Sequence, residues 1–241
     1  MTKIYVIGIG YKPLDKRERK IFYNSEFILS SSRLFEVFKR YKEFKKVKER
    51  VLVIDTVDGT VEFIKYRIKE HDEKGLITVL ASGDPLFFGI GRRIISEFGK
   101  DRVEIMPDLS SIQMAFSRIK EPWDNAFLMS LHKGPDPQKR RSTRYEIKDI
   151  PSLLERHKKI AILTDMENNP SEISKFLISS SITRDLSPII FVCERLGYTD
   201  ENITTGLPED IAGKSFSTPN VMVILLKVNS EQWDKIKNEP G

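Results

Sequence analysis

Short apolar runs rich in β-branched residues alternate along this chain with segments whose apolar residues recur every three or four positions. Runs such as 4–9 and 76–81 are apolar at consecutive positions and too short for a helix, which is typical of buried strands. Segments such as 34–41 and 61–68 carry one apolar stripe, which is typical of amphipathic helices. This alternation predicts an α/β fold with largely parallel strands. Further strands are expected at 51–54, 103–106, 126–131, 160–163, 189–193 and 221–228, and further helices at 112–119 and 173–177.

The length of 241 residues allows one large domain or two modest ones. The segment 120–124 follows a predicted helix and contains a proline, and the strand pattern starts again after it. We therefore expect two α/β domains, an N-terminal one at 1–120 and a C-terminal one at 124–241.

Cysteine and histidine are too sparse for several classes of small protein. The one cysteine, Cys193, lies in an apolar run and predicts an inert core residue, and the three histidines lack metal-ligand spacing. Neither a disulfide scaffold nor a metal site is expected. No run approaches the roughly 20 apolar residues of a membrane span, and the N-terminus lacks the features of a signal peptide. We expect a soluble cytoplasmic protein that does not bind a membrane.

The charge balance fits an anionic small molecule, a nucleic acid, or no particular partner. Forty basic residues against thirty-five acidic ones give a formal charge of +5, and such an excess bears on encounter and solubility rather than fold. A nucleic-acid-binding protein is a distant alternative. Single-strand binders interleave aromatic and basic side chains, whereas most aromatic residues here sit at core-facing spacings. No nucleic-acid partner is therefore expected.

Two glycine-rich segments follow predicted strands. Gly8-Ile9-Gly10 resembles the start of a dinucleotide fingerprint, but Pro13 stands where its third glycine belongs, which argues against a Rossmann cofactor site. The loop that opens with Gly83 and Asp84 lies at the carboxyl end of an apolar strand, where open α/β sheets bind ligands. By itself this loop could equally be an ordinary β–α turn.

Three further segments are ambiguous when each is taken alone. Ser110 could be a helix N-cap, and the Asn169-Pro170 pair could be a plain turn into a helix. The segment 217–220 could be only the entry to the last strand.

The order and spacing of these segments nevertheless resemble the tetrapyrrole methylase family over essentially the whole chain. The similarity is greatest to the branch that methylates C5 of cobalt-precorrin-7, which is equivalent to the N-terminal part of precorrin-6Y C5,15-methyltransferase. The glycine loops are common to the family, and the later segments select the branch. The segments are Gly8-Ile9-Gly10, Gly83-Asp84-Pro85-Leu86-Phe87-Phe88-Gly89, 107–111, Pro122-Trp123-Asp124, Ser130-Leu131-His132, Leu163-Thr164-Asp165, Asn169-Pro170, Glu194-Arg195-Leu196-Gly197 and Thr218-Pro219-Asn220.

This resemblance implies a homodimer whose subunits each hold S-adenosylmethionine in a cleft between two α/β domains. It implies methylation of a precorrin ring carbon in cobalamin biosynthesis, with a separate decarboxylating C15-methyltransferase as a possible partner. Another member of the family, specific for a different precorrin carbon or similar to diphthine synthase, is the alternative. The implied cofactor-binding residues are Ile9, Ser82, Gly83, Asp84, Phe87, Ser110, Ser111, Asp165, Leu196, Pro219 and Asn220.

Corrin precursors carry many carboxylates, so basic side chains are the candidates for substrate binding. No catalytic base is named, because a sulfonium methyl group is already activated. The chain departs from the family pattern at Tyr11, where a proline is common, and at Asp108, where a glycine is usual. The substrate-binding candidates are Arg92, His132, Lys133, Arg140 and Arg141, with Arg93 and Arg144 as further possibilities.

Overall fold

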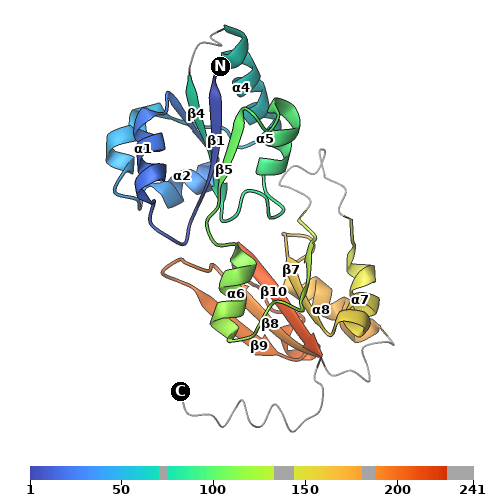
Figure 1. The fold of residues 1–241 in the computed structure, drawn as a ribbon. Helices are drawn as coiled ribbons and strands as arrows, with labels where there is room; N and C mark the ends of the chain where they lie inside the picture. The colour runs from blue at the N-terminus through green and yellow to red at the C-terminus, as the bar shows by residue number, and fades with distance from the viewer. Residues whose placement is uncertain (71–74, 133–143, 181–187, 227–241) are drawn as a thin grey trace. The chain divides into compact units, whose positions relative to one another are not determined.

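The computed structural model describes residues 1–70, 75–132, 144–180 and 188–226, and the chain divides into two compact units, Met1–Ser110 and Ser111–Gly241 (Figure 1). Each unit is an α/β layer structure around its own five-stranded sheet. The elements of the first unit are β1 (Lys3–Ile9), α1 (Lys16–Asn24), β2 (Phe27–Ser30), α2 (Ser32–Phe38), α3 (Phe44–Val47), a 3-10 turn (Lys48–Arg50), β3 (Val51–Val53), α4 (Val57–Glu70), β4 (Leu76–Ser82), α5 (Gly91–Phe98) and β5 (Val103–Met106).

The sheet of the first unit has the order β3-β2-β4-β1-β5 and is entirely parallel. Helices α1 and α2 lie to one side of it, and α4 and α5 lie to the other (Figure 1). Buried residues such as Ile4, Val79 and Ile64 form a core between the sheet and α4 and α5. Coverage of both faces explains why β1 and β4 are apolar at consecutive positions.

Local hydrogen bonds specify where the first helix begins. Asp15 accepts a bond from the Glu18 amide at 2.7 Å, and Glu18 accepts one from the Asp15 amide at 2.7 Å, which makes a capping box. The helix α1 therefore starts several residues after β1, and the intervening loop lies at the carboxyl edge of the sheet.

The second unit has a mixed sheet of order β6-β7-β10-β8-β9. Only β6 and β7 pair in parallel, and the other three pairs are antiparallel. The elements are α6 (Ser111–Ile119), β6 (Phe127–Ser130), a 3-10 turn (Ile147–Asp149), α7 (Ile150–His157), β7 (Lys159–Leu163), α8 (Pro170–Ser179), β8 (Pro188–Glu194), β9 (Asn202–Gly206), α9 (Pro208–Ile211) and β10 (Asn220–Leu226).

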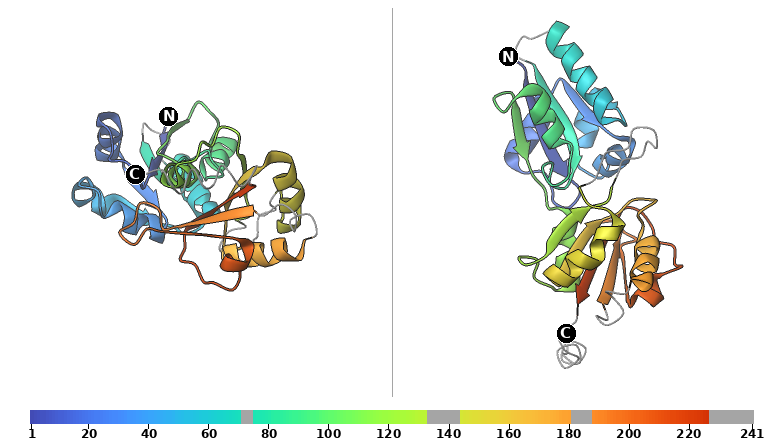
Figure 2. Two further views of the ribbon diagram at one scale, coloured as in Figure 1. Left: turned by 90° about the horizontal axis from the view of Figure 1, so that it is seen from below. Right: turned by 90° about the vertical axis from the view of Figure 1, so that its right-hand side faces the viewer.

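The prediction of largely parallel strands is thus confirmed for the first sheet and wrong for the second. Both β8 and β10 are buried along almost their whole length. One large cluster of buried residues joins these strands to α7, α8 and α9, while α6 and α8 lie on opposite sides of the sheet (Figure 2). A continuous apolar run reports burial on both faces, and it carries no information on strand direction.

The helix α6, which we predicted to close the first domain, belongs to the second unit. It contacts β7 and β10. The segment predicted as the boundary is also held there, because the Lys159 ammonium donates to the Pro122 carbonyl at 2.7 Å and pairs with Glu121 at 3.3 Å. The chain therefore passes from the first unit to the second between Ser110 and Ser111 rather than at 120–124.

Candidate functional site

Three strands of the first unit end together and bring their following loops to one edge of the sheet. Ile9 lies opposite Ser82, and Ile7 lies opposite Met106. The carboxyl edge of a parallel sheet is where open α/β proteins bind ligands. The structure therefore places Ile9, Ser82 and the loop at Gly83 side by side.

The loops approach so closely that two positions require glycine. A Cβ atom on Gly8 would lie 1.8 Å from the Gly83 carbonyl oxygen and 2.6 Å from the Asp108 nitrogen. Gly83 has a φ of +59°, and a Cβ there would lie 2.6 Å from the Leu109 carbonyl oxygen. Hydrogen bonds join the same loops, since the Gly83 amide donates to Ile9 at 3.1 Å and the Asp108 amide donates to Gly83 at 3.2 Å.

The loop between β4 and α5 is a closed turn. Asp84 Oδ1 accepts a hydrogen bond from the Leu86 amide at 2.8 Å, and the Phe87 amide donates to the Asp84 carbonyl at 3.1 Å. The Phe87 and Phe88 rings meet edge to face at 4.8 Å between centroids. Ser82 is exposed and Asp84 is half-buried. The turn thus presents a hydroxyl, a carboxylate and aromatic surface at the edge of the sheet.

The two departures from the family pattern meet each other. Asp108 is buried, and its Oδ2 accepts a hydrogen bond from the Tyr11 amide at 2.8 Å while its Oδ1 accepts one from the Leu109 amide at 2.7 Å. The side chain at Asp108 therefore connects the loop after β1 to the loop after β5. The serine pair follows directly, with Ser110 buried at the end of the first unit and Ser111 starting α6.

The second unit gathers its predicted residues at one edge of its own sheet. Strands β7 and β8 end there and β10 begins there, because Val221 pairs with Leu163 and Asn220 pairs with Glu194. The four cofactor-binding candidates that follow β7 and β8, or that precede or begin β10, are thereby brought to the same edge. These residues are Asp165, Leu196, Pro219 and Asn220.

Asp165 organises the turn after β7. Its Oδ1 accepts hydrogen bonds from the Glu167 amide at 3.0 Å and the Asn168 amide at 2.7 Å. The Asn168 side chain donates to the Leu131 carbonyl at 3.1 Å, which joins this turn to the end of β6. Sequence reasoning did not single out Asn168, which holds the turn of a predicted site residue, and its place directly after that turn was the available signal.

The turn after β8 is held from both sides. The Arg195 amide donates a hydrogen bond to the Pro219 carbonyl at 2.8 Å. The peptide bond between Thr218 and Pro219 is cis. Glu201 accepts a hydrogen bond from the Gly197 amide at 2.8 Å and pairs with Arg118. Burial raises the pKa of Glu201, but the hydrogen bonds with Arg118 and Gly197 together lower that pKa by more. Its pKa therefore lies below the usual value. Glu201 was not foreseen from the sequence.

The structure separates the basic candidates. The Arg92 guanidinium lies 6.0 Å from the Phe88 ring centroid, beside the loop after β4. Arg93 is instead paired with Glu97 at 3.0 Å and with Asp58 at 3.7 Å. His132 is exposed just after β6, and its amide donates to the Ser130 hydroxyl at 3.3 Å. Lys133, Arg140 and Arg141 lie outside the described residues.

Arg144 lies 5.4 Å from the Tyr145 ring centroid. Cys193 is fully buried in β8. Burial, with Glu201 and Glu194 nearby, raises the pKa of its thiol to about 12.

Over the described ranges, no group of three potential metal ligands is close enough to hold an ion. In that same part of the chain, no helix is both long and apolar enough to cross a membrane.

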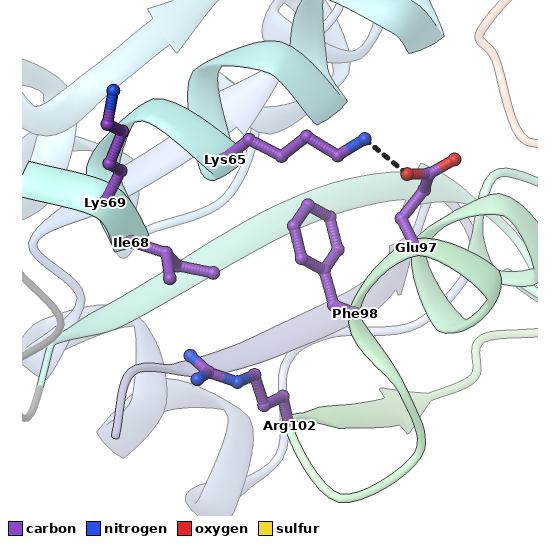
Figure 3. A pocket seen from close by; sticks show the side chains of 6 residues that line it. All are labelled: Lys65, Ile68, Lys69, Glu97, Phe98 and Arg102. Carbon is purple, nitrogen blue, oxygen red and sulfur yellow. Dashed lines mark ion pairs between the residues drawn. The ribbon is translucent and has the colours of Figure 1, made fainter.

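A separate hollow of about 280 Å³ lies between α4 and α5 in the first unit (Figure 3). Ile68 and Phe98 form its apolar base, and a 2.5 Å ion pair between Lys65 and Glu97 crosses its rim. It lies where α4 and α5 end and β5 begins, so it is distinct from the loops at the carboxyl edge. The cofactor-binding candidates do not line it.

Comparison with known proteins identifies the fold and the family. A family model described as Tetrapyrrole (Corrin/Porphyrin) Methylases matches residues 3–212. The chain belongs to this family. A probable cobalt-precorrin-7 C(5)-methyltransferase of Methanocaldococcus jannaschii is 30% identical over 224 residues, which cover 91% of this chain and 96% of that relative. The resemblance inferred from the ordered motifs is therefore confirmed.

Solved structures share the tetrapyrrole methylase fold. A precorrin-6Y methylase from Archaeoglobus fulgidus has a TM-score of 0.62 at 20% identity, over 94% of this chain and 99% of that one. A uroporphyrin-III C-methyl transferase from Thermus thermophilus, solved with S-adenyl homocysteine, has a TM-score of 0.64 at 16% identity, over 92% of this chain and 91% of that one. The predicted fold class is thereby confirmed.

Proposed function

We propose that this tetrapyrrole methylase is an S-adenosylmethionine-dependent C-methyltransferase of cobalamin biosynthesis that methylates C5 of cobalt-precorrin-7. The observation that carries this proposal is the end-to-end similarity to the Methanocaldococcus jannaschii relative, which bears that activity in its name. Two of the motifs that favour this branch, the turn at Leu196 and the strand end at His132, lie at one edge of the second sheet.

The loops of both units suit a small polar cofactor. In the first unit, Gly8 and Gly83 keep side chains out of the space where three loops meet, while Ser82 stays exposed beside them. We assign Ile9, Ser82, Gly83, Asp84, Phe87 and Ser110 of the first unit to the cofactor. We assign Ser111, Asp165, Leu196, Pro219 and Asn220 of the second unit to the same cofactor.

Catalysis in this proposal depends on placement. When bound, S-adenosylmethionine supplies a sulfonium methyl group that is already activated for transfer to an electron-rich ring carbon. The chain contributes by holding donor and acceptor in line, and good orientation is worth about 7–11 kcal/mol of a reaction barrier. The loops at Gly83 and Asp165 are closed by internal hydrogen bonds, so their backbone groups are oriented before ligands arrive.

A substrate with many carboxylates would be recognised by basic side chains. We assign Arg92, His132, Lys133, Arg140 and Arg141 to this role. Reversing the charge of Arg140 and Arg141 together is expected to weaken tetrapyrrole binding while leaving S-adenosylhomocysteine binding unchanged. Equal loss of both kinds of binding, or of neither, would contradict the assignment.

The adjacent arginines on α5 provide a matched comparison. Arg92→Glu is expected to weaken tetrapyrrole binding, because its guanidinium lies beside the loop after β4. Arg93→Glu should have a smaller effect on the same binding, because Arg93 already pairs with Glu97 and Asp58. The reverse order of effects would place the substrate elsewhere.

The experiment that tests the function is calorimetry with S-adenosylhomocysteine, followed by methyl transfer to a panel of precorrins with and without cobalt. Failure to bind S-adenosylhomocysteine would refute the proposed activity. Methylation of a different ring carbon would refute the C5 assignment and leave the family activity intact.

The proposal extends to the setting of the reaction. We propose that the enzyme is a cytoplasmic homodimer and that a separate decarboxylating C15-methyltransferase acts with it. Sedimentation at several concentrations tests the dimer, and a sole monomeric species would refute it. Co-purification with that second enzyme tests the partnership.

A further inference from the structure

The loop that follows β1, formed by residues 10–12, uses every one of its backbone amides internally. The Gly10 amide donates to the Tyr41 hydroxyl at 2.8 Å. The Tyr11 and Lys12 amides donate to Asp108 Oδ2 at 2.8 Å and 3.3 Å. A glycine turn after a strand often points its amides at an anionic ligand. Here those amides are already bonded to side chains, so the loop cannot serve as such an anion nest.

Two further hydrogen bonds that involve side chains also hold this loop. The Tyr41 hydroxyl donates to the Lys12 carbonyl at 3.0 Å, and the Lys12 ammonium donates to the Pro107 carbonyl at 2.7 Å. The Tyr41 ring packs against Phe38, with 6.0 Å between centroids. Burial raises the pKa of Tyr41 above its usual value, and the charge of Asp108 acts in the same direction. The hydrogen bond with Gly10 lowers this pKa, but by less than burial raises it. The hydroxyl is therefore protonated and able to donate at neutral pH.

Asp108 connects this loop to the predicted cofactor loop. Its carboxylate holds Tyr11 and Lys12, while its own amide donates to the Gly83 carbonyl at 3.2 Å. The Gly83 amide in turn donates to Ile9, directly before the loop at 10–12, at 3.1 Å. Asp108 is 5% exposed, so water does not replace these bonds easily.

We propose that Tyr41 and Asp108 are positioning residues that hold the loop at 10–12 in its binding-competent conformation before the cofactor arrives. The inference rests on the proposed function, since it assumes that S-adenosylmethionine binds beside this loop. When a loop is already ordered in the free protein, binding does not have to supply the free energy of ordering it, and the affinity is higher. Neither side chain needs to touch the cofactor.

The test uses Tyr41→Phe, Asp108→Asn and Asp108→Ala, with calorimetry of S-adenosylhomocysteine and hydrogen exchange at the amides of residues 10–12. If loosening lowers the binding-competent fraction to about one tenth, the apparent Kd rises about tenfold. Exchange at these amides should be faster in each free variant, and bound S-adenosylhomocysteine should restore their protection. The controls are the exposed residues Tyr66 and Asp101, changed to Phe and Asn, which should leave Kd and exchange as in the wild type.

The two side chains hold one loop, so their effects should be coupled. In the double variant Tyr41→Phe/Asp108→Asn, the rise in Kd should be smaller than the product of the two single effects. Tyr41→Phe keeps the ring packing and therefore keeps the test informative if Asp108→Ala does not fold.

The outcomes separate this inference from the proposed function. A wild-type protein that fails to bind S-adenosylhomocysteine would refute the function and the inference together. Wild-type binding with an unchanged Kd in Tyr41→Phe and Asp108→Asn would refute the inference alone. Lower thermal stability with normal exchange at residues 10–12 and a normal Kd would show a merely structural role and would also refute it.

Discussion

The close approach of three loops at Gly8 makes a single methyl group a severe perturbation. In Gly8→Ala, the new Cβ would lie 1.8 Å from the Gly83 carbonyl oxygen and 2.6 Å from the Asp108 nitrogen. Both neighbours are backbone atoms, so the clash cannot be relieved by rotating a side chain. At least one loop must move away from β1.

The cost follows from strain and from lost hydrogen bonds. Overpacking of a well-packed site costs about 1–3 kcal/mol. Displacing the Gly83 loop also endangers the bonds from Gly83 to Ile9 and from Asp108 to Gly83, each worth about 1 kcal/mol net. We expect the free energy of unfolding to fall by about 4 kcal/mol. For a chain of this size that loss corresponds to a Tm roughly 8–16 °C lower.

The assay is urea denaturation combined with calorimetry of S-adenosylhomocysteine. Gly8→Ala should lose both stability and binding, because the displaced loop carries Gly83 and Asp84. Gly99→Ala is the control. Gly99 also has a positive φ, +78°, but a Cβ there would meet nothing within 4 Å. Gly99 also has a ψ of 158°, in a region essentially restricted to glycine, so that variant should lose about 1–3 kcal/mol through backbone strain alone and bind normally.

One result would refute the reasoning. If Gly8→Ala were as stable as Gly99→Ala and bound S-adenosylhomocysteine with the wild-type Kd, the loops could not be packed as closely as the structure shows.

Three further predictions concern the second unit. Ser174 is fully buried in α8, and its hydroxyl has no hydrogen-bond partner within the described part of the chain, so Ser174→Ala should raise the free energy of unfolding by about 1 kcal/mol in urea denaturation; a clear loss of stability would contradict this. Cys193 has a pKa raised from 9.0 to about 12 in the folded state, so alkylation at about pH 8 should require unfolding, and stability should decline as pH rises above the unfolded value; rapid alkylation of the native protein would contradict this. Glu201 has a lowered pKa, so its contribution exists above its unfolded value of 4.5 and is lost as pH falls. Glu201→Gln should therefore cost about 1 kcal/mol at neutral pH and progressively less below the unfolded value, and a deficit that grows in acid would refute the assigned pairing.

Strand ends were the part of the candidate site most accessible to sequence reasoning. A glycine turn after an apolar run marks the carboxyl end of a strand, and parallel strands bring such ends together. This logic marked the turn at Gly8-Ile9-Gly10 and the loop at Gly83 as strand ends, and the structure shows that β1 and β4 end side by side. Asp165 and Leu196 came instead from the family resemblance, and the structure brings them to one edge because β7 and β8 run in the same direction although neither pairs with the other.

Several elements were not predicted because their own residues carry too weak a pattern. Strands β2 and β9 were not predicted, since β2 spans only Phe27–Ser30 and β9 carries little apolar patterning in Asn202–Gly206. Each of these strands is stabilised by hydrogen bonds to its neighbouring strand, and a short or polar segment carries no apolar pattern that predicts this pairing. The domain boundary differs from the predicted one because α6 contacts β7 and β10, strands far along the chain, and so belongs to the second unit.

The sequence by itself determined the α/β class, the family and the order of the glycine, serine and proline turns, because these depend on residue type and short spacing. The tertiary structure alone decided the direction of β8 and β10, the pairing of Arg93 rather than Arg92, and the meeting of Tyr41 and Asp108 at the loop after β1. The bonds from that loop span 31 and 97 positions. Apolar periodicity reports which face of an element is buried, and it does not report which distant side chain will complete its hydrogen bonds.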